Sequence, residues 1–286
     1  MKKIKVELLL DLPKSELGEG PVWDHRDNTL WWLDILGGNL HSFNQGNGKS
    51  KTYSIGQYIG AAIPCKDNGL VLAAHQGFYL FYPNNQQLVP MGALRLDSSN
   101  IRFNDGQCDA KGRFWVGTME IEADQNVGKL YCLTKGKTTE KLDGVLCSNG
   151  IAWSLDQTKM FYIDSLKHKL QVFDFDMETS HISNGKDLIT FEKSMGYPDG
   201  MTIDENGNLW ICFYDGSKVC CFDPKTGAEI TRIEMPLQRP TSCTFGGPNM
   251  DVLYITSAKK NEDPLGGSLF VSHPNVKGPT ANFYVK

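Results

Sequence analysis

The chain has 286 residues and a formal net charge of −4, with 40% apolar and 22% charged residues. These values are ordinary for a globular protein, and we expect one domain over residues 1–286. No Lys/Arg block or basic stripe is present, so we expect no nucleic-acid partner. No stretch approaches the roughly 18 apolar residues of a membrane span, which excludes a helical membrane anchor.

The cysteines and histidines of this chain favour a reduced protein without a zinc site of the His/Cys kind. None of the eight cysteines forms a C-x-x-C pair, and most lie in apolar, strand-like runs. Such cysteines are typical of buried thiols in a reducing compartment, so we expect a cytoplasmic protein. The six histidines are scattered, with no H-x-H or H-E-x-x-H. We therefore expect oxygen atoms to bind any metal.

In chain order, a first strand over residues 3–10 is followed by six copies of a strand–turn–strand unit. The first copy, 18–34, aligns without a gap to the fourth, 148–164. The third and fifth copies share the pattern D-x-x-G-x-φ-W, at Asp109–Trp115 and Asp204–Trp210. The copies begin near residues 19, 61, 104, 149, 199 and 241.

A spacing of about 40–50 residues, with several short strands in each unit, is typical of propeller blades. Helical solenoids share this period but need apolar residues at a spacing of 3.6. We therefore predict an all-β fold, a six-bladed β-propeller with a central metal-binding channel. The strand at residues 3–10 is expected to close the ring against the last blade.

One position of the repeat has unusual occupants. It lies five residues before the turn, and in the six units it holds Glu19, Ala61, Asn104, Asn149, Asp199 and Thr241. Inner strands of a propeller run the same way along the axis, so two carboxylates and two amides would converge. Each of these side chains could instead serve only its own blade, as an Asn capping a turn does.

Converging carboxylates are costly unless a positive charge compensates them. Carboxylate and amide oxygens suit calcium, magnesium or manganese. We therefore predict one divalent metal ion in the channel. Chemistry alone would count Asn104 among its ligands.

Five motifs of this chain together resemble the SMP-30/gluconolactonase/luciferin-regenerating-enzyme family. They are LGEGPVWD (17–24), RFNDGQCDAKGRFWVGTM (102–119), SNGIAWSLD (148–156), YPDGMTIDENGNLW (197–210) and TSCTFGGP (241–248). The resemblance runs from about residue 15 to near the C-terminus. It implies a six-bladed propeller, in agreement with the repeat count.

The resemblance also implies roles for individual residues. Glu19, Asn149 and Asp199 would be the metal ligands, and Asp199 would also be the general base. Substrate would contact Arg102, Asn104 and Glu122, with Glu120 a competing candidate because the sequence here reads MEIEAD.

Family resemblance further implies a metal-dependent hydrolase that opens sugar lactones such as glucono-1,5-lactone. Calcium fits the oxygen ligands best, while zinc, manganese and magnesium stay open. The expected partner is a small sugar lactone, and we expect a monomer or weak oligomer. The alternatives are a phosphotriesterase-like or luciferin-regenerating-type hydrolase, or a non-catalytic calcium-binding propeller.

Overall fold

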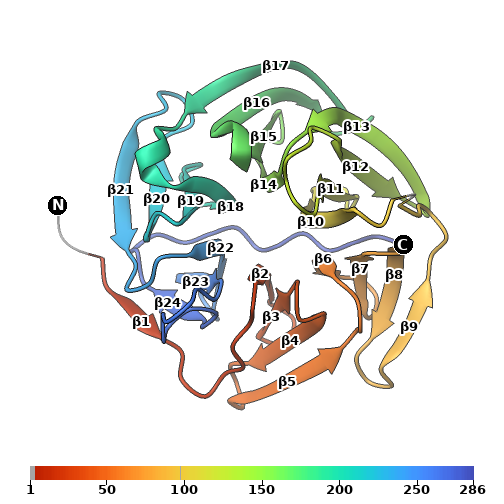
Figure 1. The fold of residues 1–286 in the computed structure, drawn as a ribbon, viewed down its shortest axis with the longest axis horizontal. Coiled ribbons are helices and arrows are strands. Elements are labelled where there is room, and N and C mark those ends of the chain that lie inside the picture. Colours follow the sequence, from red (N-terminus) through yellow and green to blue (C-terminus); the bar gives the residue numbers. More distant parts are fainter. Residues whose placement is uncertain (1–3, 97) are drawn as a thin grey trace.

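The computed structural model describes residues 4–96 and 98–286. It contains six four-stranded antiparallel sheets, arranged as blades around a central axis (Figure 1). The predicted six-bladed β-propeller is therefore confirmed. Each of the first five blades is one continuous stretch of chain whose strands run in order from the axis outward.

The first three blades have the following strands. Blade one contains β2 (Gly18–Asp24), β3 (Thr29–Asp34), β4 (Asn39–Asn44) and β5 (Lys49–Ser54). Blade two contains β6 (Ile59–Pro64), β7 (Leu70–Ala74), β8 (Gly77–Tyr82) and β9 (Gln87–Pro90). Blade three contains β10 (Ile101–Cys108), β11 (Phe114–Glu120), β12 (Gly128–Thr134) and β13 (Lys137–Val145).

The other three blades follow the same plan. Blade four contains β14 (Ser148–Trp153), β15 (Lys159–Asp164), β16 (Lys169–Asp176) and β17 (His181–Thr190). Blade five contains β18 (Tyr197–Ile203), β19 (Leu209–Tyr214), β20 (Lys218–Phe222) and β21 (Glu229–Glu234). Short 3-10 helices η1 (Ser165–Lys167) and η2 (Lys193–Met195) lie in and after blade four.

Blade six is completed by the N-terminal strand. Its inner strands are β22 (Pro240–Gly246), β23 (Val252–Ser257) and β24 (Phe270–Ser272). The outermost strand is β1 (Val6–Leu8), which pairs antiparallel with β24. The predicted ring closure is thus confirmed over these residues, while residue 3 of the predicted strand lies outside the described residues.

The repeated D-x-x-G-x-φ-W pattern has a structural cause. In blade three, Asp109 accepts hydrogen bonds from the backbone N–H groups of its own turn, and its Oδ2 accepts one from Trp115 Nε1 at 2.8 Å. In blade five, Asp204 Oδ2 accepts the corresponding bond from Trp210 Nε1 at 3.0 Å. One carboxylate therefore holds the turn and satisfies the only polar atom of a buried indole ring.

A C-terminal strap, residues 276–286, crosses one end of the central channel (Figure 1). Its backbone bonds to blade six through Gly278 N–H and Met250 C=O, and to blade two through Tyr284, which pairs with Cys65. Tyr284 is fully buried. Residues 279–282 line a cavity together with residues of the inner strands, so the strap covers this end of the channel.

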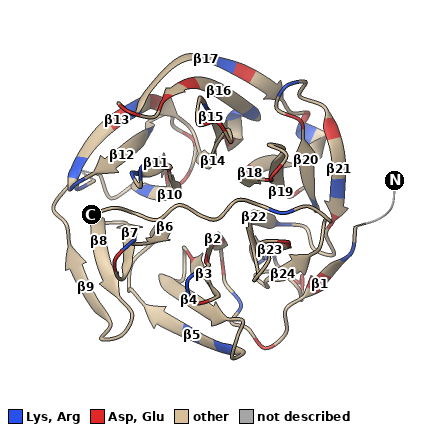
Figure 2. Ribbon diagram, turned by 180° about the vertical axis from the view of Figure 1, so that it is seen from behind, with Lys and Arg blue, Asp and Glu red and all other residues tan. Residues whose placement is uncertain are grey.

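Charged residues are concentrated in the outer strands, and residues of both signs alternate along β17 and β21 (Figure 2). The inner strands β14 and β22 are buried along their whole length. Over residues 4–96 and 98–286, no helix is long and apolar enough to cross a membrane.

Candidate metal centre and active site

A pocket of about 280 Å³ lies at the end of the channel opposite the C-terminal strap. The side chains at its base are those that the repeat position singles out. Its lining includes Glu19, Asn149 and Asp199, the three predicted metal ligands, together with Arg102 and Asn104. Four inner strands, β2, β10, β14 and β18, supply these five residues. The structure thus brings together every predicted site residue except Glu122.

Each inner strand has a register shift at the site position. In β14 the shift falls between Asn149 and Ile151, and in β6 it falls between Ile59 and Ala61. In blade two the residue at the site position is apolar whether the strand is aligned on the repeat, which gives Ala61, or on the shift, which gives Ile59. The next residue, Gly60, lies against the backbone of Asn104, where a Cβ atom would come within 2.6 Å of its nitrogen. Blade two gives the site no polar group in either alignment.

Two aspartates hold the segments that lead into the site strands. Asp34 accepts hydrogen bonds from the backbone N–H groups of Glu16 and Leu17, just before Glu19. Asp164 accepts the equivalent bonds ahead of Asn149. These aspartates occupy matching positions of the repeat, so the sequence pattern that identifies the blades also fixes two of the predicted ligands.

The two amides of the site differ in what their oxygens contact. Asn149 Nδ2 donates a 2.8 Å bond to Ser165 Oγ, while its Oδ1 is buried without a partner. Asn104 Oδ1 accepts a 2.5 Å bond from Arg102 Nη1, and its Nδ2 donates to the Ser148 carbonyl. The free oxygen of Asn149 is available to a cation, whereas the oxygen of Asn104 already contacts a cation of the protein.

Burial in this pocket disfavours negative charge. Desolvation, followed by repulsion from neighbouring carboxylates, raises the pKa of Glu19 and that of Asp199 well above their ordinary values. Asp105 is one of these neighbours, and burial raises its own pKa to about 6. The compensating hydrogen bonds, such as Gly20 N–H to Glu19 Oε2, are too few to reverse this.

Sequence reasoning missed Asp105. Its side chain lines a small chamber next to the pocket, along with Gly20 and Ser242. The signal was present in the repeat, because the residue after the site position is glycine in blades one, four and five and aspartate in blade three. A side chain therefore extends from this position only where the usual glycine is replaced.

The residues of the pocket fit a divalent cation. Asn149 Oδ1 and Asp199 Oδ1 are buried without hydrogen-bond partners, which is costly for polar atoms. The carboxylates of Glu19 and Asp199 line this pocket with the guanidinium of Arg102, and the nearby Asp105 adds to the repulsion that both carboxylates feel. In the part of the chain that the structure describes, no three His, Cys, Asp or Glu side chains form a metal-binding cluster by themselves. The free Oδ1 atom of Asn149 adds an amide oxygen to the carboxylate oxygens of this pocket.

Arg102 is the positive group of the pocket. Its side chain is buried, and burial lowers its pKa, although the guanidinium remains charged in proteins. Among the described residues, Arg102 donates hydrogen bonds only through Nη1, to the Phe103 carbonyl and to Asn104 Oδ1. The other nitrogen donors are free to bind a ligand.

The two candidate glutamates lie outside the pocket lining. Glu120 is buried, and its Oε2 accepts bonds from the backbone N–H groups of Asp124 and Gln125, so it holds the loop after β11. Glu122 is exposed on this loop. Ala123, the next residue, does line the pocket. Substrate contact by Glu122 therefore stays a prediction that depends on this loop.

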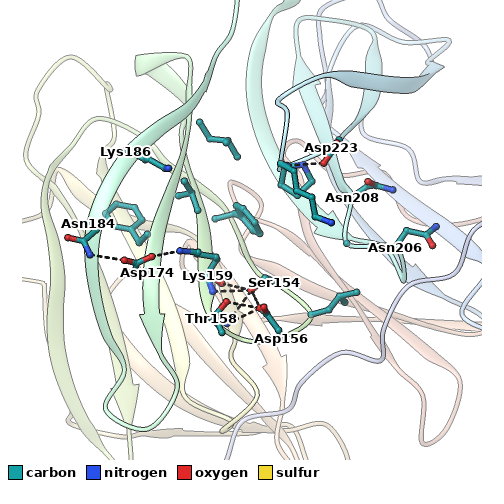
Figure 3. A pocket seen from close by; sticks show the side chains of 18 residues that line it. Ser154, Asp156, Thr158, Lys159, Asp174, Asn184, Lys186, Asn206, Asn208 and Asp223 are labelled. Carbon is teal, nitrogen blue, oxygen red and sulfur yellow. Dashed lines mark hydrogen bonds and ion pairs between the residues drawn. The ribbon is translucent and has the colours of Figure 1, made fainter.

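A larger groove of about 910 Å³ lies between blades four and five (Figure 3). Its three aspartates, Asp156, Asp174 and Asp223, already accept hydrogen bonds from neighbouring groups. Asp174 contacts Lys159 and Asn184, and Asp156 accepts bonds from Ser154 and Thr158. No group of unpaired ligands converges there among the labelled residues, so we assign the functional site to the channel pocket.

Fold and site together define a six-bladed propeller with an acidic, oxygen-rich pocket at one end of its channel. Comparison with known families identifies the family to which this propeller belongs. The sequence matches the family described as "SMP-30/Gluconolactonase/LRE-like region" over residues 17–259, and the chain belongs to this family.

Relatives and solved structures agree with this assignment. Regucalcin of Xenopus laevis is 36% identical, with 98% of this chain and 99% of the relative covered. A Bacillus subtilis protein named "Putative sugar lactone lactonase YvrE" is 34% identical, with 93% and 94% covered. A luciferin-regenerating enzyme has a TM-score of 0.94 at 30% identity, covering 99% of this chain and 100% of the other. A calcium-binding regucalcin from Agrobacterium tumefaciens has a TM-score of 0.93 at 27% identity, covering 99% and 98%.

Proposed function

We propose that this protein is a metal-dependent hydrolase that opens sugar lactones, such as glucono-1,5-lactone, to their free acids. One observation carries the proposal: unpartnered oxygens of Asn149 and Asp199 lie in one buried pocket with the open donors of Arg102. A lone ion site would not need this guanidinium. Membership of a family that includes gluconolactonases supports the choice of reaction.

Glu19, Asn149 and Asp199 would hold the cation. A divalent ion supplies Lewis-acid polarisation of a lactone carbonyl and lowers the pKa of a water molecule. Arg102 donates hydrogen bonds to the substrate hydroxyls and, after ring opening, to the product carboxylate. Asn104 keeps the guanidinium in place through its 2.5 Å bond to Nη1.

Asp199 accepts the proton of the attacking water in this proposal. Its pKa is raised above the ordinary value by burial, which increases its basicity, while bonding to a cation would reduce it. The strap closes the other end of the channel, so substrate reaches these groups from one side only.

We propose calcium as the resident ion, because hard oxygen ligands suit it and a regucalcin of similar structure is named as calcium-binding. Zinc, manganese and magnesium are to be compared with it. All eight cysteines are free, which supports a reducing, cytoplasmic location.

Hydrolysis of glucono-1,5-lactone, followed by proton release, tests the proposal. We expect turnover that a chelator abolishes and that added calcium restores. Arg102→Met should raise KM while one equivalent of metal still binds. Absence of metal-dependent turnover on every aldonolactone tried, in protein that binds one ion, would refute the lactonase proposal.

Luciferin regeneration is a second candidate activity, favoured by the TM-score of 0.94 to a luciferin-regenerating enzyme. The same preparation can be assayed for this activity in parallel. Turnover there, without turnover of any aldonolactone, would replace the first proposal by the second.

A further inference from the structure

One wall of the pocket carries sulfur. Cys147 Sγ and Met119 Sδ lie 3.6 Å apart, and both residues line the pocket. Cys147 Sγ is also 3.8 Å from Asn149 Nδ2 and 3.9 Å from Asn104 Nδ2. The proposed hydrolytic reaction uses neither sulfur atom.

Cys147 differs from the other cysteines of the chain. Seven of the eight cysteines are buried, whereas Cys147 is partly exposed. Its backbone is held on both sides, since its N–H donates to Asp164 Oδ1 and its carbonyl accepts from Ser165 N–H. The thiol is therefore presented to the pocket from a fixed position.

Unsatisfied oxygens accompany the two sulfurs. Asn149 is 4% exposed and Asp199 is 6% exposed, and the Oδ1 atom of each has no hydrogen-bond partner. Both residues line the same pocket as Cys147. The wall thus combines two soft ligand atoms with buried oxygens that need a cation.

We propose that Cys147 and Met119 form a binding site for thiophilic cations in the wall of the active-site pocket. Thiolate and thioether sulfurs select soft ions, whereas calcium and magnesium gain nothing from them. At about 2.3 Å per metal–sulfur bond, two sulfurs up to roughly 4.6 Å apart can share one ion. The observed separation of 3.6 Å fits a bent arrangement.

The thiol loses one proton to solvent when its bond to the ion forms, and the thioether loses none. The proposal concerns metal binding, which is measured without substrate. It therefore stands or fails separately from lactone hydrolysis.

Titration of the metal-free protein with Cd²⁺ tests the site through the ultraviolet absorption of the cadmium–thiolate bond. We expect one equivalent of Cd²⁺ to produce this band and to release one proton. Cys147→Ser should abolish the band. Met119→Leu should keep it with an affinity lowered at least ~10-fold, the lower bound for losing even an outer-shell partner.

Two control variants separate this site from the rest of the protein. Cys132→Ala, at a buried cysteine of blade three, should leave the band unchanged. Glu19→Gln weakens the site formed by oxygen ligands. It should also leave the absorption band unchanged, because both sulfur ligands remain. A band that persists in Cys147→Ser, or is absent from the wild-type protein, would overturn the proposal. Circular dichroism of each variant verifies that it is folded.

Discussion

The two ends of the central channel are formed by the same six inner strands, but among the described residues only one end has a buried carboxylate oxygen without a hydrogen-bond partner. At the end where these strands begin, Asn149 Oδ1 and Asp199 Oδ1 have no partners. At the other end, backbone groups of the C-terminal strap bond to blades two, three, five and six. An unpaired buried polar group costs about 1–3 kcal/mol, and the cost is larger when the group is charged, as a carboxylate is.

This difference separates function from stability along one axis. At the open end burial and mutual repulsion raise the pKa values of Glu19 and Asp199, and we propose that a cation relieves this repulsion. At the closed end Tyr284 is fully buried, and the Phe283 ring lies under the guanidinium of Arg26. Changes at the open end should therefore affect chemistry, and changes at the closed end should affect folding.

The largest expected effect compares two aspartates of one blade. Asp199→Asn should lower kcat/KM for glucono-1,5-lactone by at least about 10²-fold, the size of a general-base contribution. Its thermal midpoint should be unchanged or higher in metal-free protein, because a desolvated charge is removed. Asp204→Asn, which weakens the bond to Trp210 Nε1, should instead lower the midpoint and keep kcat/KM. Equal losses of activity in the two variants would contradict the separation.

At the closed end, Tyr284→Ala should reduce the free energy of unfolding by about 3 kcal/mol, because it empties a buried aromatic site. Denaturant unfolding of the metal-free and calcium-loaded proteins measures the change. Metal stoichiometry and kcat/KM at a temperature where the variant is folded should equal those of the wild type. A lost ion in a stable Tyr284→Ala protein would show that the two ends are coupled.

Within the open end, the two amides should have different roles, Asn149 in metal binding and Asn104 in substrate binding. Asn149→Ala removes a free oxygen and should weaken calcium binding by at least about tenfold, as measured by calorimetry. Asn104→Ala should keep calcium binding and raise KM by about tenfold, because Arg102 loses its partner. The reverse pattern would make Asn104 the metal ligand.

The smallest effect concerns the stability of the metal-free protein against pH. The folded-state pKa of Asp105 is about 6, above the ordinary value of 3.8. Below pH 4 both states are protonated, but between pH 4 and 6 the unfolded chain releases its proton first, so stability falls as pH rises. Asp105→Asn should reduce this fall, while Glu19 and Asp199, whose pKa values are also raised, should maintain the rest of it. Thermal melts across this range measure it, and a wild-type midpoint that rises between pH 4 and 6 would contradict the account.

Much of this architecture could be predicted from the sequence, because propeller blades repeat their turn and core residues. The alignment of Asp34 with Asp164, and the pattern from Asp109 to Trp115, gave the blade number and the axial position of Glu19 and Asn149.

Parts of the site depend on contacts that no repeat encodes. The pairing of Asn104 Oδ1 with Arg102 distinguishes it from Asn149, although both are asparagines at the same position. Asp105 was hidden because its blade departs from the usual glycine. The strap is a single segment without a copy, so its path across the channel required the structure.

A crystal of this protein soaked in Mn²⁺, with the anomalous signal of the ion recorded, tests the central claim most directly. We expect one peak of anomalous density per chain, at coordination distance from side-chain oxygens of Glu19, Asn149 and Asp199. A crystal without a peak there, or with the ion bound by Asn104 in place of Asn149, would contradict it.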